Sequence, residues 1–352
     1  MDQKKMKHVF LLLIVALPAI VSCQKEKITI GTNVSETFYV ENNGASMRVL
    51  VEGNTSGRVF IVFVHGGPGA GAYIYNTDYI TNNIEDKYAI VYWDERNSGA
   101  SQGSSNGRYL TLEQMTDDLK KVIQVIKVRY GMSSEVFILG HSFGGLLTSS
   151  FMTTGNNQQM VKGWIFADGS HNYPLNDTLT RQMLISVGQQ QIALNNNKAR
   201  WEEIVSYCKT HTGNFSLYES DQMEKYAEEA ESYINGVTKV DIYKLFSNNA
   251  VKYNWPLTSM LMNYLFSSEA AINKDLATTE FSSSLDKVTV PVLILFGEYD
   301  FVCPVGLGYD LMSHISSTDK KIVISSISGH SIMFQDEVLF CNEVNEFISL
   351  HR

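Results

Sequence analysis

Residues 136–145 read Val-Phe-Ile-Leu-Gly-His-Ser-Phe-Gly-Gly. The four apolar residues at the start are typical of a short strand buried on both faces of a sheet. The residues from Phe143 onward have the character of a helix. Between them lies a G-x-S-x-G pattern, whose glycines allow a sharp strand-to-helix turn where Cβ atoms have no room. Such a turn lifts the hydroxyl of Ser142 above the sheet, beside the N-terminus of the helix.

Strand-like and helix-like segments alternate on both sides of this turn. Val59–Val64 and Tyr88–Trp93 are unbroken apolar runs, and Leu112–Tyr130 has the apolar spacing of a helix that Gly131 ends. The other expected elements are an opening hairpin (Phe38–Val40 and Met47–Val51), three strands (Trp164–Ala167, Val292–Phe296 and Ile322–Ser325) and a closing helix (Val338–Leu350). This alternation predicts an α/β fold with a mostly parallel, doubly wound sheet.

Residues 171–285 interrupt this alternation. They contain few strand-like runs but many helix formers and aromatic residues, among them Trp201 and Tyr226. We interpret residues 171–285 as a mostly helical cap inserted into a core formed by residues 36–170 and 286–352. Aromatic residues at helical spacing more often pack inside such a cap than contact a substrate.

The composition excludes several classes of protein. A chain of 352 residues with 44% apolar content can bury a large core, and 18% charged residues is not typical of disorder. The net charge of −9 and the absence of internal basic runs argue against a nucleic-acid partner. Cys208, Cys303 and Cys341 do not have the spacing of a zinc site or a disulfide framework, so we expect buried thiols.

The N-terminal residues have the pattern of an export signal. Lysines precede Val9–Val21, an apolar stretch too short for a permanent membrane anchor. The stretch ends in Ile20-Val21-Ser22-Cys23, which resembles the lipobox of bacterial lipoproteins. The resemblance implies that residues 1–22 are a signal peptide, that Cys23 is acylated and that residues 23–35 are a tether. It implies an exported lipoprotein, anchored in a membrane at the periplasmic face or the cell surface. An ordinary signal peptide with an incidental Cys23 is the alternative.

A serine hydroxyl is a weak nucleophile at neutral pH, so Ser142 needs a base and an acid that orients the base. His330 is favoured as the base because it follows a predicted strand, at the carboxyl edge where doubly wound proteins build their sites. Asp300 is favoured as the acid for the same reason. Asp168, which follows another predicted strand, is the rival acid, and Glu298 is a third candidate.

The segment His65-Gly66-Gly67-Pro68-Gly69 follows the predicted strand Val59–Val64. Its glycines let the backbone pass close to a substrate carbonyl. A tetrahedral intermediate needs N–H donors, and we predict that the backbone N–H groups of Gly67 and Phe143 form this oxyanion hole. A glycine-rich turn without a ligand is the alternative. The segment does not match the patterns of phosphate-binding loops.

Three segments together resemble the proline iminopeptidase-like branch of the α/β-hydrolases: His65–Gly69, Asp94–Ser101 and Gly140–Gly145. The resemblance covers roughly residues 45–170 and 288–350. It implies the α/β-hydrolase fold with a helical cap, and a serine-histidine-aspartate triad whose members follow one another as Ser142, Asp300 and His330 in the chain. It also implies release of N-terminal residues, often proline, from short peptides, without a metal or an organic cofactor.

The chain departs from the family pattern at four positions, and the two beside Ser142 bear on the substrate. Glu95 and Asn97 stand where the family's D-Q-R-G-x-G-x-S has Gln and Gly. His141 and Phe143 stand where the peptidases often have Gly and Trp. The turn that carries Ser142, the nucleophile elbow, therefore resembles the elbows of esterases and other hydrolases as much as those of peptidases.

An aminopeptidase must also bind a free α-ammonium group, usually with carboxylates from the cap. Glu202 and Glu203 follow Trp201 and loosely resemble the family's Trp-Glu, so they are candidate substrate-binding residues. The cap holds further acidic residues at Glu224, Glu228, Glu229 and Glu231. The alternative is that these charges form the solvated face of cap helices.

The predicted function is that of a serine hydrolase that forms an acyl-enzyme, most similar to a proline iminopeptidase-type aminopeptidase. A carboxylesterase, lipase or lactonase is the runner-up, because amide and ester hydrolysis share one intermediate. A non-catalytic binding protein on the same scaffold is the remote alternative. The expected partner is a small peptide or an ester, and the sequence does not define an oligomeric state.

Overall fold

The computed structural model describes residues 28–103, 109–213, 215–240, 272 and 276–352. The predicted signal peptide (residues 1–22), Cys23 and the first part of the tether lie outside the described residues, as does most of the cap sequence from residue 241 to 275. No helix among the described residues is both long and apolar enough to cross a membrane.

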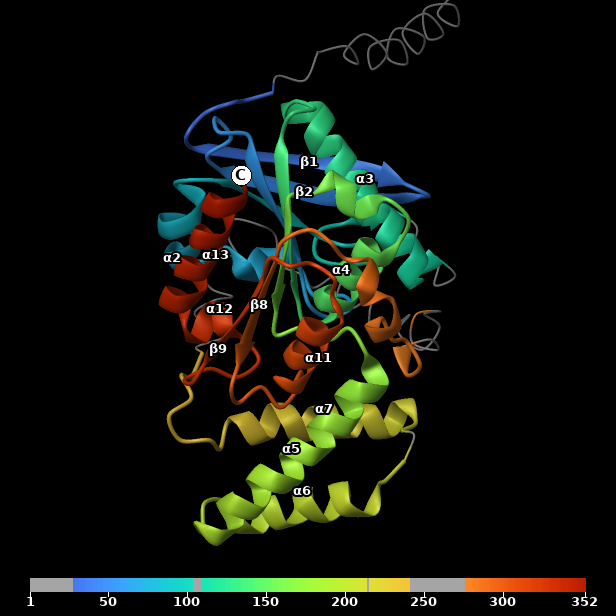
Figure 1. Ribbon diagram of the computed structural model, residues 1–352, viewed down its shortest axis with the longest axis vertical. Helices are drawn as coiled ribbons and strands as arrows, with labels where there is room; N and C mark the ends of the chain where they lie inside the picture. Colours follow the sequence, from blue (N-terminus) through green and yellow to red (C-terminus); the bar gives the residue numbers. More distant parts are fainter. Residues whose placement is uncertain (1–27, 104–108, 214, 241–271, 273–275) are drawn as a thin grey trace, which may run out of the picture.

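The described strands form one mixed sheet in the order β1-β2-β4-β3-β6-β7-β8-β9, with β5 beside β2 (Figure 1). β1 and β2 are an antiparallel hairpin, β2 is antiparallel to β4, and every pairing from β4 to β9 is parallel. The bounds are Val34–Asn42 (β1), Ala45–Gly53 (β2), Val59–Val64 (β3), Ala89–Trp93 (β4), Gln102–Gly103 (β5), Glu135–His141 (β6), Gly163–Ala167 (β7), Val292–Gly297 (β8) and Lys320–Ser325 (β9).

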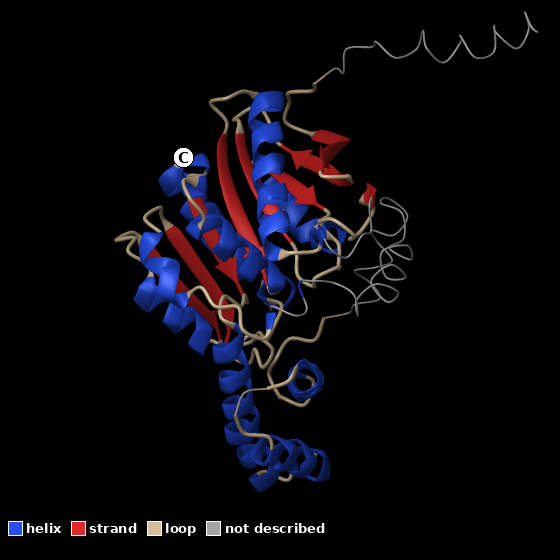
Figure 2. Ribbon diagram, turned by 90° about the vertical axis from the view of Figure 1, so that its right-hand side faces the viewer, coloured by secondary structure: helices blue, strands red, loops and turns tan. Residues whose placement is uncertain are grey.

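Helices cover both faces of this sheet, as Figure 2 shows. Side chains alternate along a strand, so in β3 Phe60 and Val62 belong to one apolar cluster and Ile61 and Phe63 to the other. This double burial explains why the strand is an unbroken apolar run. The first cluster includes helices α3 (Leu112–Tyr130), α4 (Phe143–Thr153) and α11 (Gly306–His314), and the second α12 (Ile332–Gln335) and α13 (Glu337–His351), with the shorter helices η1 (Ala72–Tyr75) and α2 (Asp78–Ile80).

Three further helices pack together beyond the carboxyl ends of the strands (Figure 1): α5 (Tyr173–Ala193), α6 (Lys198–Thr210) and α7 (Leu217–Glu231). They share a separate apolar cluster that includes the buried aromatic residues Trp201 and Tyr226. A capping box at Ser216 and Glu219 begins α7. These helices therefore have a core of their own above the edge of the sheet where β7 and β8 end.

The predicted fold class is confirmed. The strand and helix predictions match the described elements within a few residues, and the opening hairpin turns at Asn43 and Gly44, which both have positive φ. Cys208, Cys303 and Cys341 are buried free thiols, as expected from their spacing.

Candidate active site

The turn between β6 and α4 holds Ser142 in a strained backbone conformation, with φ 55° and ψ −122°. The glycines around it are required by close packing. A Cβ atom at Gly140 would lie 2.4 Å from the carbonyl oxygen of Gly144, and one at Gly144 would lie 2.2 Å from that of Val64. The conformation places Ser142 at the N-terminus of α4, where unpaired N–H groups favour negative charge.

The structure brings the three predicted catalytic residues into hydrogen-bond contact at the carboxyl edge of the sheet. Nε2 of His330 lies 2.9 Å from Oγ of Ser142, and Nδ1 lies 2.9 and 3.1 Å from the carboxylate oxygens of Asp300. Asp300 is fully buried and also accepts the N–H groups of Val302 and Cys303. Its carboxylate is therefore fixed and can orient the imidazole.

The protonation of His330 follows from these contacts. Asp300 accepts from Nδ1, so Nδ1 carries a proton and neutral His330 offers the lone pair of Nε2 to Ser142. Burial by itself lowers the pKa of His330, but the charge and hydrogen bond of Asp300, together with the charges of Asp168 and Glu231, raise that pKa to about 9.

The two rival acids do not contact the imidazole of His330 through a hydrogen bond. Asp168 is buried, and its two carboxylate oxygens each accept one backbone N–H group, from Gly297 and from Ile332, at 2.8 Å. Burial, and then repulsion from Asp300, raise the pKa of Asp168 well above its ordinary value. Asp168 therefore joins the end of β8 to the segment after His330. Glu298 is exposed on its loop.

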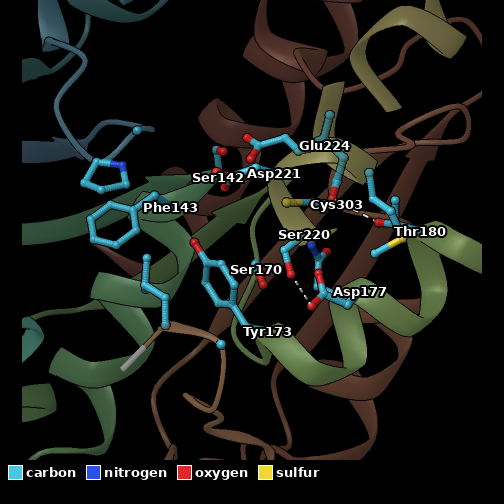
Figure 3. Close-up of a pocket in the computed structure, with 17 residues that line it drawn as sticks. Ser142, Phe143, Ser170, Tyr173, Asp177, Thr180, Ser220, Asp221, Glu224 and Cys303 are labelled. Atoms are coloured by element: carbon cyan, nitrogen blue, oxygen red, sulfur yellow. Dashed lines mark hydrogen bonds between the residues drawn. The ribbon is translucent and has the colours of Figure 1, made fainter. Parts of the chain in front are cut away.

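The predicted oxyanion donors face the same cavity as Ser142 (Figure 3). Phe143 is the first residue of α4, and the first N–H groups of a helix have no partner within it. Gly67 lines the same cavity. The carbonyl oxygen of Gly66 accepts from Nδ1 of His65 at 2.7 Å, which fixes the planar peptide group whose N–H belongs to Gly67.

The loop that begins at Asp94 is held in place by buried hydrogen bonds to other segments of the chain. Asp94 accepts the N–H groups of Ala72 and Ala100. Arg96 makes two hydrogen bonds to the carboxylate of Asp118, at 2.5 and 2.7 Å, and both side chains are buried. These hydrogen bonds fix the loop beside the glycine-rich segment His65–Gly69.

Glu95 in this loop is fully buried, and neither of its carboxylate oxygens has a hydrogen-bond partner among the described residues. Nδ1 of His65 lies 4.0 Å away but already donates to Gly66. Burial, and then repulsion from Asp118 and Asp94, raise the pKa of Glu95 well above its ordinary value. The side chain is therefore held as a neutral acid where the family has a neutral Gln.

We expect Glu95→Gln to stabilise the protein increasingly as the pH rises. The folded state keeps its proton while the unfolded state loses it above about pH 4.5, so the wild type loses up to about 1.4 kcal/mol of unfolding free energy per pH unit in that window. The Gln variant has no such titration. Denaturant unfolding of both proteins between pH 5 and 8 measures the difference, with Glu298→Gln as an exposed control. A constant difference across this range would contradict the prediction.

A cavity of about 240 Å³ adjoins Ser142, between the sheet edge and helices α5 and α7. Its lining contains three carboxylates, Asp177 from α5 and Asp221 and Glu224 from α7 (Figure 3). Burial raises the pKa of Asp177 to about 6. Glu224 is exposed at the cavity, and partial removal of its carboxylate from solvent, followed by repulsion from Glu228, raises its pKa. The cavity is thus suited to a cation, which would restore the ionised form of both acids.

The structure does not bring Glu202 and Glu203 to this cavity, which corrects the prediction made from their position after Trp201. Their side chains are 54% and 59% exposed and form ion pairs with Lys198 and Arg200 on the surface of α6. The cause is helix geometry: successive residues lie about 100° apart around the axis, so a buried Trp201 turns the next two residues outward.

Asp177 and Asp221 are not among the candidates that the sequence indicates. One pattern could have indicated them. Asp177 is followed by Thr180, and Asp221 by Glu224, so each helix presents polar groups three residues apart on one face. All four of these residues line the cavity.

Glu231, at the end of α7, has a different role from the cavity carboxylates. Its carboxylate accepts the backbone N–H of His330 at 2.9 Å and the side-chain amide of Gln335 at 2.8 Å. Gln335 in turn accepts the N–H groups of Gly329 and Ser331. A helix of the cap is therefore bonded directly to the loop of the candidate base.

Comparison with known proteins places this site in a family. The profile of the family described as "Serine aminopeptidase, S33" matches residues 56–246, more than half of the chain. The chain belongs to this hydrolase family. It is accordingly a serine hydrolase with the α/β-hydrolase fold.

Two curated relatives align over most of their length. A probable aminopeptidase, YbaC, of Bacillus subtilis is 20% identical over 87% of this chain and 97% of its own. A proline iminopeptidase of Flavobacterium johnsoniae is 21% identical over 84% of this chain and 91% of its own.

Two solved structures illustrate the range of the fold. The proline iminopeptidase of Mycobacterium smegmatis has a TM-score of 0.61 at 17% identity, over 90% of this chain and 98% of that one. An esterase of Exiguobacterium antarcticum has a TM-score of 0.55 at 17% identity, over 91% of this chain and 100% of that one. Peptidases and esterases therefore share this architecture.

Proposed function

We propose that the protein is an aminopeptidase of the proline iminopeptidase type, which releases N-terminal residues from short peptides through a triad of Ser142, His330 and Asp300. The observation that carries the proposal is the hydrogen-bonded row of these three residues beside a cavity walled by carboxylates. The triad can carry out acyl transfer. The carboxylates supply a site for the free α-ammonium group that distinguishes an N-terminal residue from an internal one.

The geometry supports the following reaction. Oγ of Ser142 attacks the carbonyl carbon of the first residue while Nε2 of His330 takes the hydroxyl proton. Negative charge moves to the carbonyl oxygen, where the N–H groups of Gly67 and Phe143 stabilise it. The C–N bond then breaks as His330 returns the proton to the leaving amine. Water attacks the acyl ester by the same route and frees Ser142. Asp300 stabilises the imidazolium at each stage.

The test compares amide and ester substrates on the purified chain from residue 24. Prolyl and alanyl anilides are offered with free and with blocked amines, beside short and long p-nitrophenyl esters. We expect cleavage of free-amine anilides that disappears when the amine is blocked. Turnover of esters alone would overturn the aminopeptidase proposal and favour the esterase function that solved structures of this fold also include.

We expect Glu224→Gln to raise KM for free-amine anilides about tenfold to a hundredfold, the loss that follows removal of one charge-assisted contact. Turnover of an ester without an amine should change little, because the triad is untouched. The matched control is Glu203→Gln, an exposed carboxylate on α6. Equal losses on the ester and the anilide would show that Glu224 does not recognise the amine.

We further propose, from the sequence pattern at Ile20–Cys23, that the mature protein is a membrane-anchored lipoprotein. Cys23→Ser should abolish incorporation of labelled fatty acid during expression in a bacterial host. The wild-type protein should carry the label. Wild-type protein exported without lipid would contradict this proposal and leave the enzymatic one intact.

A further inference from the structure

His141, the residue before the nucleophile, makes two hydrogen bonds that join separate parts of the site. Its Nε2 lies 2.8 Å from the carbonyl oxygen of His330, and its Nδ1 lies 2.8 Å from the hydroxyl of Tyr75. A carbonyl oxygen can only accept, so Nε2 carries the proton and Nδ1 accepts from Tyr75. Both contacts therefore require one neutral tautomer of His141.

Tyr75 continues this chain of hydrogen bonds on the other side. Its hydroxyl oxygen accepts the N–H of Gly66 at 3.2 Å. Its ring is buried between Phe63 and Phe334, with ring centroids 4.2 and 5.6 Å away, so the hydroxyl has little freedom to move. We call this series of hydrogen-bonded residues, Gly66, Tyr75, His141 and His330, the elbow relay. Every hydrogen bond in it pairs a donor with an acceptor: Gly66 donates to Tyr75, Tyr75 donates to His141, and His141 donates to the carbonyl of His330.

The two ends of the elbow relay hold the segments of the oxyanion donor Gly67 and the base His330, which act on the same substrate. One end fixes the N–H of Gly66, whose carbonyl side precedes the oxyanion donor Gly67. The other end fixes the main chain of His330. Ser142 lies between them, and a Cβ atom at Gly66 would be only 3.0 Å from that of Ser142. A small shift of either end would therefore misplace a donor or the base relative to Ser142.

We propose that Tyr75 and His141 are positioning residues, which hold the Gly67 donor and the base His330 in register with Ser142. The inference rests on the catalytic roles given to Ser142 and His330 under the proposed function. It assigns a role to the histidine at a place where the peptidases of the family often have glycine.

The charge of His141 is consistent with this role. Burial, and then repulsion from His330, lower the pKa of His141 to about 3. The side chain therefore stays neutral at any pH at which His330 can act as a base. A second proton on Nδ1 would reverse this hydrogen bond, so that Tyr75 accepts and its own hydroxyl proton loses its acceptor in the relay. A positive His141 would also oppose the imidazolium that forms on His330, whose ring centroid is 5.0 Å away.

The test measures kcat and KM for four single variants on the best substrate found above. Tyr75→Phe keeps the packed ring and removes the hydroxyl, and we expect it to lower kcat about tenfold with KM nearly unchanged. His141→Leu should lower kcat about a hundredfold. His141→Gln should recover much of that loss, because its amide nitrogen can reach the place of Nε2 and donate to His330. Tyr92→Phe is the control: it removes a buried hydroxyl bonded to Glu85 in the same aromatic cluster, outside the relay.

Phenylboronic acid, which forms a tetrahedral adduct with an active serine, provides a second readout. Its inhibition constant should rise in Tyr75→Phe and His141→Leu by factors that follow the losses in kcat. The double variant Tyr75→Phe, His141→Leu should lose little more than His141→Leu alone, because residues that act as a unit are not additive.

Several results would overturn the inference. These are an unchanged kcat in Tyr75→Phe, equal losses in Tyr75→Phe and Tyr92→Phe, no recovery in His141→Gln, or losses that multiply in the double variant. The first three would mean that the hydrogen bonds only support folding or do not matter. Failure of the proposed function is distinguishable, because it would appear as ester turnover without cleavage of free-amine anilides, or as activity in Ser142→Ala, whatever the relay variants do.

Discussion

Ser142→Ala is expected to lower kcat by about a millionfold while the protein stays folded. The hydroxyl is the atom that forms the acyl ester, and the described residues around it offer no other nucleophile in contact with Nε2 of His330. Turnover that depends on acyl transfer must then fall to what the oxyanion donors and substrate binding alone supply. The measurement is kcat on the anilide or ester that the wild type cleaves best.

Stability separates this chemical loss from unfolding. Alanine at residue 142 has the same positive φ as serine and loses only the hydrogen bond to His330, so Tm should stay within about 5 °C of the wild type. Ser149→Ala is the matched control, since Ser149 lies on the same helix with its buried hydroxyl bonded to the carbonyl of Gly145. It should keep its turnover. Substantial activity in Ser142→Ala would remove Ser142 from the nucleophile's role.

Much of the fold could be predicted because the sheet is buried on both faces. An unbroken apolar run such as Val59–Val64 has few other stable placements, and the glycines at 140 and 144 are needed only at a turn this tight. Asp300 and His330 could be found from the same pattern. Each follows a strand that ends at the edge where Ser142 stands, so topology alone brings them close.

The substrate cavity could not be predicted in this way. Asp177 and Asp221 lie on two helices whose relative placement depends on how the cap packs. The periodicity of each helix in the sequence does not indicate that placement. The neighbouring Trp201 suggests Glu202 and Glu203 as substrate-binding residues, but burial of Trp201 in the cap turns both to solvent. The elbow relay is hidden for the same reason, because the partners of His141 are 66 and 189 residues away in the chain.

Asp300→Asn is expected to lower kcat about ten-thousandfold, the second-largest loss. An amide in place of the carboxylate can donate to Nδ1 of His330 and so favours the tautomer whose Nε2 carries the proton and cannot accept from Ser142. Asp168→Asn should lower kcat far less, about tenfold. The carboxylate of Asp168 accepts only backbone N–H groups and acts on the imidazole of His330 indirectly, through that backbone. The reverse ranking of the two variants would move the acid to Asp168.

The pH profile gives Asp300→Asn a signature that a packing defect would not produce. His330 acts as a base only when it is neutral, so kcat/KM rises with pH through its pKa. Among the groups that raise this pKa against the effect of burial, Asp300 contributes most, so removing its charge must lower the pKa and move the acid limb of the residual activity to lower pH. Asp168 raises the same pKa less, so Asp168→Asn should move the limb in the same direction by a smaller step. An acid limb that stays in place in Asp300→Asn would mean that the ionisation controlling turnover belongs to another residue.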